Sequence, residues 1–222
     1  MVVNGRLLLI RHGRVDFDST EFRQSPRGRQ WDPPLDDRGL EQAGLLALRL
    51  AAMDAPAVLA SSPFRRCLET IEPFARPIGR EPIVDEDLGE VFVGDWEGVR
   101  FEDLLAMDDG LVRERIHEQR ALFDVAPGGE SGAELRARVV PAIERLVAGV
   151  ERGLVVVIAH GGVVNAYLGH VMGIPQDMFF FPENSSVSTV DVDNDRRDVR
   201  FLGDVAHLVY PALFRTGDDQ AM

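Results

Sequence analysis

The chain contains two short hydrophobic runs without a polar residue, 7–10 and 154–159. A run of this kind and length predicts a strand that is buried on both faces, as in a parallel sheet. The first run is followed by Arg11 and His12, the second by His160, and a glycine follows each histidine. Ligands bind at the carboxyl ends of the strands in open α/β sheets. We therefore expect both histidines at a ligand-binding edge of the sheet.

Apolar residues recur at helical spacing in two longer stretches. Residues 40–53 predict a helix that Asp36 or Asp37 can cap, because a carboxylate accepts hydrogen bonds from the free N–H groups at a helix start. Residues 131–150 predict a second helix, which opens with the capping-box sequence Ser-Gly-Ala-Glu. Pro141 lies inside this pattern and should kink or split the helix, because proline lacks an N–H and clashes with the preceding turn.

Further short runs complete a predicted sheet. Residues 57–60 and 83–84 have the length and composition of strands, and residues 186–192 and 199–202 predict a hairpin. Residues 14–37 are interrupted by proline and glycine. We expect that segment to form an irregular loop.

The alternation of buried strands with amphipathic helices predicts an α/β fold. We expect three layers, α/β/α, with a mostly parallel central sheet. A chain of 222 residues is long enough for one domain of ordinary core size, and no linker or repeat divides it. Residues 1–222 are therefore expected to form a single domain, with a helical insertion at about 100–127. The tail after residue 214 is expected to be disordered.

The net charge of the chain is −13, and all 24 basic residues are arginine. Such an acidic chain is poorly suited to nonspecific binding of nucleic acid or anionic membranes, so we expect neither as a partner. The absence of lysine excludes a P-loop NTPase, a Schiff-base enzyme and a protein kinase. A phosphate ligand stays compatible with the composition, because a binding site needs only local positive charge.

Cys67 is the single cysteine, so the chain cannot form an internal disulfide, and a reducing compartment fits this composition. No hydrophobic run approaches the ~20 residues that a membrane span requires. The N-terminus lacks the pattern of a secretory signal. We therefore expect a cytoplasmic protein. These features leave open whether copies of the chain associate as a homo-oligomer.

Another cationic position is predicted at the start of the helix that follows residues 57–60. Ser61 or Ser62 can cap this helix. Arg65 and Arg66 then fall in its first turn, where free N–H groups and the helix dipole already attract anions. An arginine at this place therefore gives a phosphate group a second reason to bind.

Two histidines with flanking arginine and glycine suit phosphoryl transfer. An imidazole can accept a phosphoryl group, and arginines hold its oxygens through paired N–H donors. A metal site is the natural rival, but the sequence has neither a His-x-His pair nor a His-Glu-x-x-His motif, so we expect no metal. These patterns alone do not decide whether His12 or His160 is the nucleophile. His170 and His207 are expected to be structural.

These motifs resemble those of a known family. Arg11-His12-Gly13 is similar to the signature of the histidine phosphatase superfamily, which includes the cofactor-dependent phosphoglycerate mutases. Further stretches follow in the order expected for that family, namely 61–66, Glu90 with 94–98, 128–131 and 160–162. The resemblance extends from about residue 7 to residue 207, which is nearly the whole chain.

The resemblance implies a role for each candidate. His12 would attack phosphorus and become phosphohistidine. Glu90 would protonate the leaving oxygen and then activate water for hydrolysis, with Glu86 and Asp87 as the alternative acids. The nonbridging oxygens would be bound by Arg11, Arg66, His160 and Gly161. The implied mechanism uses neither a metal nor another cofactor.

The segment after Gly13 departs from the family pattern. Many members have an asparagine where this chain has Asp18, and an ionised Asp18 would repel phosphate. Arg14 can offset this repulsion with positive charge at the rim, so Arg14 and Asp18 are our candidates for substrate binding. In the family, the region of the predicted insertion covers the active site. Here it is acidic, with four arginines against seven acidic residues between positions 100 and 124, and His117 within it is expected at the surface.

We predict a phosphohydrolase that removes phosphate from a small phosphorylated metabolite through a phosphohistidine intermediate. A cofactor-dependent phosphoglycerate mutase is the alternative enzyme. The acidic cover and the altered segment after Gly13 disfavour it, because a mutase must retain a highly charged bisphosphorylated intermediate. A catalytically silent phosphate-binding module is the alternative outside the enzymes, and the presence of Glu90 disfavours it, because a binder needs no acid.

Overall fold

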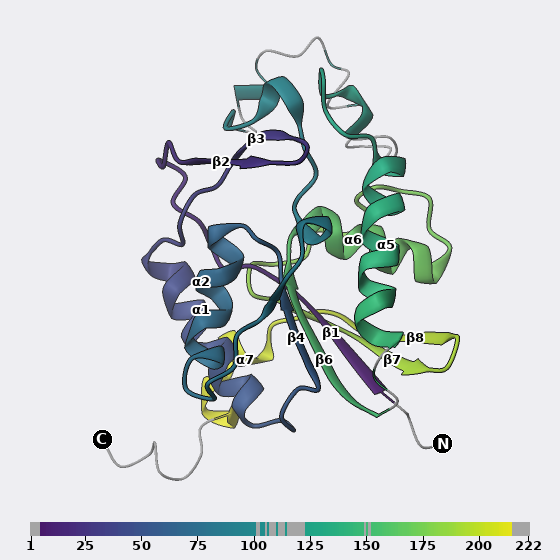
Figure 1. The fold of residues 1–222 in the computed structure, drawn as a ribbon. Helices are drawn as coiled ribbons and strands as arrows, with labels where there is room; N and C mark the ends of the chain where they lie inside the picture. Colours follow the sequence, from purple (N-terminus) through teal and green to yellow (C-terminus); the bar gives the residue numbers. More distant parts are fainter. Residues whose placement is uncertain are drawn as a thin grey trace.

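The computed structural model describes residues 5–100, 123–148 and 152–214, together with residues 103, 104, 106, 110, 114 and 150. Within these residues, one central sheet has six strands in the order β5 (Ile83–Val84), β4 (Val58–Ser61), β6 (Gly153–Ala159), β1 (Gly5–Arg11), β7 (Val187–Asp193) and β8 (Arg196–Asp204). The first four run parallel, and β7 and β8 are antiparallel to their neighbours. Helices lie on both faces of the sheet (Figure 1). The predicted α/β fold with a mostly parallel sheet is confirmed.

The strands β1 and β6 lie side by side at the centre of the sheet. Leu7 and Leu9 of β1 pack on one face, and Leu8 and Ile10 pack on the other. All four side chains are at most 1% exposed. The expectation of a strand buried on both faces is therefore confirmed, and its physical reason is that helices cover both sides.

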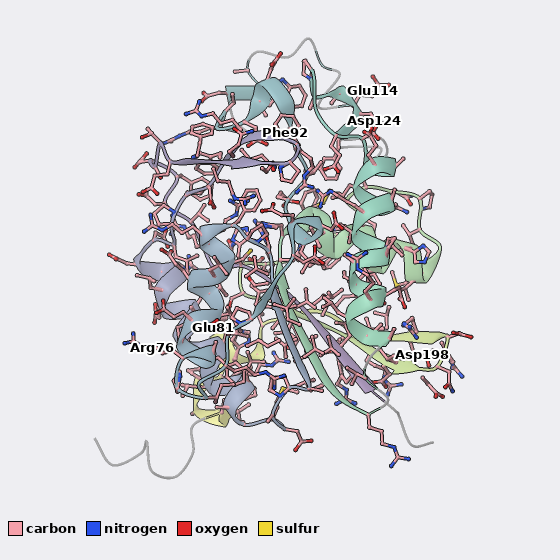
Figure 2. All side chains as sticks on the ribbon, viewed as in Figure 1. Arg76, Glu81, Phe92, Glu114, Asp124 and Asp198 are labelled. Carbon is pink, nitrogen blue, oxygen red and sulfur yellow. The ribbon has the colours of Figure 1, made fainter. Side chains whose placement is uncertain are left out.

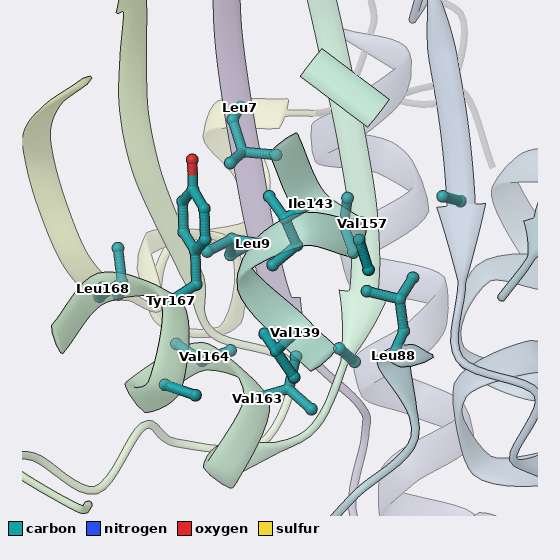
Figure 3. Packing of buried hydrophobic residues seen from close by; sticks show 14 of the residues in the cluster. Leu7, Leu9, Leu88, Val139, Ile143, Val157, Val163, Val164, Tyr167 and Leu168 are labelled. Atoms are coloured by element: carbon teal, nitrogen blue, oxygen red, sulfur yellow. The ribbon is translucent and has the colours of Figure 1, made fainter. Parts of the chain in front are cut away.

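The face that receives Leu7 and Leu9 is covered by α5 (Gly132–Ala148) and α6 (Gly161–Met172). Figure 3 shows Ile143 of α5 and Tyr167 of α6 packed around these two leucines. Full burial of a side chain of this size contributes about 1.5–3 kcal/mol to folding. This packing fixes α6, whose first residue follows His160 directly.

The opposite face is covered by α1 (Asp37–Ala51) and α2 (Arg65–Ala75). Leu46 of α1 and Ile71 of α2 pack there against Leu8 and Ile10. The short helix α7 (Ala206–Val209) lies against α1 near the end of the described chain (Figure 1). Both helix layers therefore depend on the central strand β1.

The predicted helix starts are close to those observed. The carboxylate of Asp36 accepts a hydrogen bond from the N–H of Gly39, 2.7 Å away, so Asp36 is the cap of α1. The capping box before α5 is confirmed: Ser131 Oγ accepts from the N–H of Glu134, and Glu134 Oε2 accepts from the N–H of Ser131. Pro141 does not split α5, which is one continuous helix.

The expectation of an irregular loop over residues 14–37 is wrong in its middle, where β2 (Phe22–Ser25) and β3 (Gly28–Trp31) form a hairpin. Pro26 lies in the two-residue turn between these strands. Proline and glycine therefore mark a turn within regular structure here, and not an irregular loop. Gly28 has a φ of +143°, and a Cβ there would lie 2.7 Å from Cζ of Phe92. Figure 2 shows Phe92 beside this hairpin.

Short 3₁₀ turns complete the described chain: η1 (Glu86–Leu88), η2 (Gly94–Trp96), η3 (Phe123–Val125) and η4 (Pro211–Phe214). Most of the insertion expected at about 100–127 lies outside the described residues, as do His117 and the tail after residue 214. That residues 1–222 form one domain stays a prediction. Across the described ranges, no helix has both the length and the apolar character needed to cross a bilayer.

Candidate active site

The carboxyl ends of β1 and β6 bring the two predicted histidines together. Arg11, the last residue of β1, pairs with Ala159, the last residue of β6. The N–H of His12 donates to the carbonyl oxygen of Ala159 over 3.0 Å. The imidazole rings of His12 and His160 meet edge to face, with their centroids 5.2 Å apart. The parallel register therefore joins two sequence motifs in one place.

A cavity of about 230 Å³ lies beside His12 and is called the catalytic cavity below. Four candidate residues line it together, Arg11, His12, Arg66 and Glu90. Much of the remaining wall is apolar or aromatic, from Val15, Phe17, Trp31, Phe64, Val91, Val93, Trp96 and Val99. Two guanidinium groups, an imidazole and a carboxylate thus face a common small space.

Hydrogen bonding defines which nitrogen of His12 carries its proton. Nδ1 lies 2.7 Å from the carbonyl oxygen of Gly13, and a carbonyl can only accept, so Nδ1 is protonated. Burial, followed by the charges of Arg66 and Arg11, holds the pKa of His12 well below its usual value. The ring is therefore neutral near pH 7, and Nε2 has an unshared electron pair. A nucleophilic imidazole requires this state.

A later loop holds the backbone around His12. The side-chain amide of Asn184 donates to the carbonyl oxygens of His12 and Gly13, at 3.2 and 3.3 Å. The N–H of Ser185 donates to the carbonyl oxygens of Arg11 and His12, at 3.0 and 3.1 Å. Ser185 has a φ of 64°, which is uncommon for a residue other than glycine. The role of this loop was not predicted, because its signal in the sequence was no more than a turn-forming Asn-Ser pair before a strand.

His160 lies behind His12 and is fully buried, with 0% exposure. The described wall of the catalytic cavity does not include it. Its Nε2 lies 2.7 Å from Oγ of Ser62, and the ring of Phe64 meets it edge to face. Burial, followed by the charge of Arg66, holds the pKa of His160 well below its usual value. His160 is therefore a neutral ring held in contact with His12.

The expectation that Ser61 or Ser62 caps α2 is wrong. The helix begins at Arg65, with Phe64 at the cap position and no side-chain hydrogen bond there. The hydroxyl of Ser61 donates to the carbonyl oxygen of Ser62, and the hydroxyl of Ser62 bonds His160. Both serines are fully buried, so their hydroxyls must be satisfied inside the protein, and neither is placed to cap the helix.

The first turn of α2 carries Arg66 into the site. Its Nη1 donates to the carbonyl oxygen of Trp31 over 3.1 Å and lies 3.5 Å from Oδ1 of Asp32. The guanidinium also lies over the ring of Phe64, 4.4 Å from the ring centroid. The side chain of the neighbouring Arg65 is half-exposed and pairs with two glutamates outside the cavity. Of the two arginines, Arg66 is the one at the cavity.

Arg11 reaches the catalytic cavity from the end of β1. Its Nη1 donates to the carbonyl oxygen of Pro182 over 2.6 Å. Its Nε is buried and has no hydrogen-bond partner among the described residues. Burial lowers the pKa of Arg11 from its usual value, while the charge of Glu90 acts in the opposite direction. A cationic N–H donor at this wall suits an oxygen of an anion.

Glu90 follows η1 in the chain and lies against the start of α6. Its Oε1 accepts from the N–H of Val91 at 3.0 Å, and its Oε2 accepts from the N–H of Gly162 at 3.4 Å. A Cβ at Gly162 would lie 2.5 Å from Oε1 of Glu90. Glycine at this position therefore permits the close approach of the carboxylate to the helix that follows His160.

A buried ion pair supports the loop that carries Glu90. Arg138 of α5 pairs with Glu130, with 2.6 Å between Nε and Oε1 and side chains 12% and 8% exposed. The same guanidinium donates to the carbonyl oxygens of Gly89 and Glu90, at 2.8 and 3.1 Å. Glu130 belongs to a motif of the family resemblance. Arg138 gave no sequence signal, because an arginine on an amphipathic helix is usually solvated.

A second carboxylate, that of Glu97, lines the catalytic cavity. It accepts from the N–H groups of Trp31 and Val93, at 2.8 and 3.1 Å. Burial raises the pKa of Glu97, although these hydrogen bonds oppose the shift. Glu86 and Asp87, the alternative acids considered from the sequence, are not in the described wall of this cavity. Glu97 is therefore the better alternative to Glu90.

Besides His160, three predicted binding residues lie outside the described wall of the catalytic cavity. Arg14 and Asp18 line a neighbouring cavity. Asp18 is largely exposed and pairs with Arg100. Gly161 is the first residue of α6, directly after His160. The site therefore has a catalytic part around His12 and a separate outer part around Arg14.

Among the described residues, no three His, Cys, Asp or Glu side chains are grouped so that they could hold a metal ion. Cys67 is buried, with its Sγ 3.5 Å from Nε2 of His160, and burial raises the pKa of its thiol. His207 is buried beside Arg49, with 3.2 Å between Nδ1 and Nη1, and His170 is exposed. A mechanism without a metal stays a prediction.

Comparison with known proteins adds an independent finding. A family model described as "Histidine phosphatase superfamily (branch 1)" matches residues 7–205. The chain is 31% identical over 180 residues to the glucosyl-3-phosphoglycerate phosphatase of Mycolicibacterium vanbaalenii, a match that covers 78% of this chain and 76% of that protein. It is 35% identical over 155 residues to the bifunctional protein Rv2228c of Mycobacterium tuberculosis, covering 70% of this chain and 41% of that protein. The chain thus spans less than half the length of the latter relative.

A solved structure shares the fold. The mycobacterial glucosyl-3-phosphoglycerate phosphatase Rv2419c in complex with VO3 matches with a TM-score of 0.74 and 26% identity, over 89% of this chain and 98% of that chain. The family model covers far more than half of the sequence and includes both histidine motifs. The chain therefore belongs to branch 1 of the histidine phosphatase superfamily.

Proposed function

We propose that this protein is a phosphohydrolase that removes the phosphoryl group from a small phosphomonoester through a phosphohistidine at His12. One observation carries the proposal. His12 is neutral, with Nδ1–H bonded to the carbonyl of Gly13, and its neutral ring shares a cavity with Arg11, Arg66 and Glu90. A relative and a solved structure named as phosphatases support the same reaction class.

In the first step, Nε2 of His12 attacks phosphorus, and the bond from phosphorus to the leaving oxygen breaks. Glu90 gives its proton to that oxygen, so the product leaves as an alcohol. The ring of His12 becomes positively charged, and the carbonyl of Gly13, which accepts Nδ1–H, stabilises that charge. Arg11 and Arg66 neutralise the nonbridging oxygens, so most of the rate gain comes from positioning and electrostatics.

In the second step, water attacks the phosphohistidine. The carboxylate of Glu90 takes a proton from the water, the P–N bond breaks, and its electron pair returns to Nε2 of His12. The products are inorganic phosphate and the starting enzyme, with Glu90 protonated again. One carboxylate therefore acts as acid and then as base, so Glu90 carries the same proton count before and after the catalytic cycle.

His160 has an oxygen-binding role in this proposal. This role requires the tautomer in which the hydroxyl of Ser62, 2.7 Å away, donates to Nε2 of His160 and the proton of the neutral ring is on Nδ1. That N–H donates to a nonbridging oxygen as the phosphoryl group transfers to His12, one ring away. The N–H of Gly161, the first residue of α6, adds a second donor.

The proposal is tested by measuring phosphate release and by trapping the phosphoenzyme. The substrates are p-nitrophenyl phosphate and a panel of phosphorylated metabolites. The parent protein should release phosphate from p-nitrophenyl phosphate and from members of a panel of sugar phosphates, phosphoglycerates and nucleotides. It should also take up an acid-labile, base-stable phosphoryl label. His12→Ala should lose both, because the attacking atom is deleted. The exposed His170→Ala is the matched control and should retain both.

Four outcomes would contradict the proposal. Interconversion of 3-phosphoglycerate and 2-phosphoglycerate faster than phosphate release would assign a mutase. No phosphate release from any substrate, with phosphate still bound, would assign a silent binding module. A label that persists in His12→Ala and vanishes in His160→Ala would exchange the roles of the two histidines. Loss of activity in EDTA, restored by a divalent ion, would overturn the metal-free chemistry.

A further inference from the structure

A second cavity, of about 590 Å³, adjoins the catalytic cavity and is called the outer cavity below. Phe17, Trp31, Gly98 and Val99 line both. The two cavities therefore meet along one shared, partly aromatic wall. A molecule that occupies the catalytic cavity reaches the outer cavity along that wall.

The sizes of the two cavities indicate how a substrate divides between them. Pockets that enclose small-molecule ligands typically have about 300–1,000 Å³. The catalytic cavity, at about 230 Å³, lies below that range, and the outer cavity lies within it. The catalytic cavity is therefore too small to enclose a whole substrate with a bulky leaving group. A phosphoryl group beside His12 takes part of its volume, and the bulk of a larger leaving group extends into the outer cavity.

An aromatic pair forms the shared wall. The indole N–H of Trp31 donates to the carbonyl oxygen of Ser19 over 2.9 Å, and its backbone N–H donates to Glu97. Phe17 is 55% exposed, with its ring centroid 6.2 Å from that of Trp31. Because Trp31 is already fixed, a ring that packs on this pair orders little of the protein. Phe17 therefore presents an apolar surface to the cavity, and no described side chain covers that surface.

The outer cavity is also cationic, in a chain with a net charge of −13. Among its described lining residues are Arg14 and Arg100, against one carboxylate, that of Asp18. The pair between Arg100 and Asp18 has side chains 55% and 87% exposed, and such exposed pairs are weak. Arg14 is half-exposed and pairs with Asp36. Both guanidinium groups can therefore accept a stronger anionic partner.

We infer that the outer cavity binds the leaving group and selects phosphomonoesters whose alcohol carries both a ring and an anionic group. This inference rests on the proposed hydrolysis at His12. The ring packs on Phe17 and Trp31, and the anionic group pairs with Arg100 and Arg14. Contacts remote from the reacting phosphorus raise kcat/KM when they help to hold the substrate for in-line attack.

A series of four synthetic substrates, called the ladder below, separates the contribution of the ring from that of the anionic group. All four lose the same kind of leaving group, a primary alkoxide. The ladder consists of propyl phosphate, 3-phenylpropyl phosphate, and the ring-substituted 4-carboxy and 4-carbamoyl derivatives of the latter. We expect the phenyl ring to raise kcat/KM by about 10-fold. The carboxylate should exceed its neutral carbamoyl counterpart by roughly 3- to 10-fold at low ionic strength, and by less at high salt. Glucose 6-phosphate and adenosine 5′-monophosphate then show whether a sugar or a heterocycle is the preferred ring.

The ratios of kcat/KM between substrates, measured within each variant, show which residue makes which contact. Phe17→Ala should reduce the ratio of 3-phenylpropyl to propyl phosphate towards one, while the carboxy-to-carbamoyl ratio persists. Arg100→Ala should reduce the carboxy-to-carbamoyl ratio towards one, while the ratio of 3-phenylpropyl to propyl phosphate persists. The exposed Arg145→Ala, which lies outside the described walls of both cavities, is the control and should leave both ratios as in the parent.

The outcomes separate this inference from the function on which it rests. If propyl phosphate and p-nitrophenyl phosphate are both inert, the proposed hydrolysis fails first. If they are hydrolysed with dependence on His12, but all four substrates of the ladder have equal kcat/KM, the outer cavity does not select the leaving group. A ladder effect that Phe17→Ala and Arg100→Ala leave unchanged would place selection elsewhere and overturn the assignment.

Discussion

The hydroxyl of Ser62 lies 2.7 Å from Nε2 of His160, and both side chains are fully buried. His160 is neutral, because burial and Arg66 hold its pKa well below the usual value. A neutral imidazole has one N–H, and a serine hydroxyl can either accept it or donate to the bare nitrogen. Ser62 therefore holds Nε2 of His160 in place, and the oxygen-binding role proposed for Nδ1 requires that Ser62 donate.

Removal of that hydroxyl should disturb catalysis more than folding. We expect Ser62→Ala to lower kcat/KM by about 3- to 10-fold, which corresponds to the loss of one ordinary hydrogen bond. Ser61→Ala is the matched control, because Ser61 is equally buried and its hydroxyl bonds only the backbone of Ser62. Equal losses of activity and equal shifts in urea midpoint for the two variants would contradict a positioning role.

Glu90→Gln tests the acid through leaving groups that differ in their need for a proton. An alkoxide is a poor leaving group, whereas a nitrophenolate leaves almost unaided. General acid catalysis contributes roughly 10²–10⁴-fold, so phosphoenzyme formation from alkyl phosphates should slow by about that factor. The same step with p-nitrophenyl phosphate should slow much less. Single-turnover measurements are needed, because Glu90 also serves as the base in the second step.

The control for that experiment is Glu97→Gln, since Glu97 is the other carboxylate in the described wall of the catalytic cavity. It should slow both substrates to a similar extent. If instead Glu97→Gln shows the dependence on leaving group and Glu90→Gln does not, the acid is Glu97.

The ion pair beneath the Glu90 loop should be important for stability. Arg138→Gln leaves Glu130 buried without its charged partner, and such a loss costs ~3–5 kcal/mol of unfolding free energy. Arg145→Gln on the same helix removes the pairs of an exposed arginine with Asp85 and Asp87 and should cost about 0–1 kcal/mol. Urea unfolding at pH 7 measures both. Similar midpoints for the two variants would show that the buried pair does not stabilise the fold.

Acid should destabilise the protein through its buried neutral histidines. Burial, with the charge of Arg49, lowers the pKa of His207 to about 4. The pKa expected for this histidine in the unfolded chain is ~6.5. Between that pH and a pH of about 4, the unfolded state binds a proton that the folded state does not bind. Stability is therefore fully retained above that window and is lost as the pH falls through it. His12 and His160, whose pKa values are also lowered, act in the same direction.

His207→Gln should reduce this loss, because it removes one titrating group and keeps an acceptor for Arg49. The measurement is the difference in urea midpoint between pH 7 and pH 5, compared with the parent and with the exposed His170→Gln. An unchanged difference in His207→Gln would mean that His207 does not contribute to acid unfolding.

Features that depend on neighbours in the chain could be predicted from the sequence alone. The apolar runs that became β1 and β6 identified the central strands, because a strand covered on both faces needs no polar residue along its length. The histidines after those strands followed from the same pattern, since the end of a strand is a chain position. The capping box before α5 was also local, as both partners lie within one turn.

Other features could not be predicted, because they depend on which surfaces meet. The β2–β3 hairpin was missed, although it supplies Trp31, which lines both cavities and holds Arg66. Proline and glycine there gave a turn signal, but whether strands flank a turn depends on the side chains that pack on them, such as Phe92 on Gly28.

The sequence by itself determined the fold class and the residue types of the site. The tertiary structure decided their chemical states. Ser62 and His160 are 98 positions apart, and Asn184 is 172 positions from His12. Their hydrogen bonds exist because the parallel register and the helix layers exclude water, so these buried polar groups pair with protein groups that are distant in the chain. The pKa of His12 is low for the same reason, since burial and approaching arginines arise only when the chain has folded.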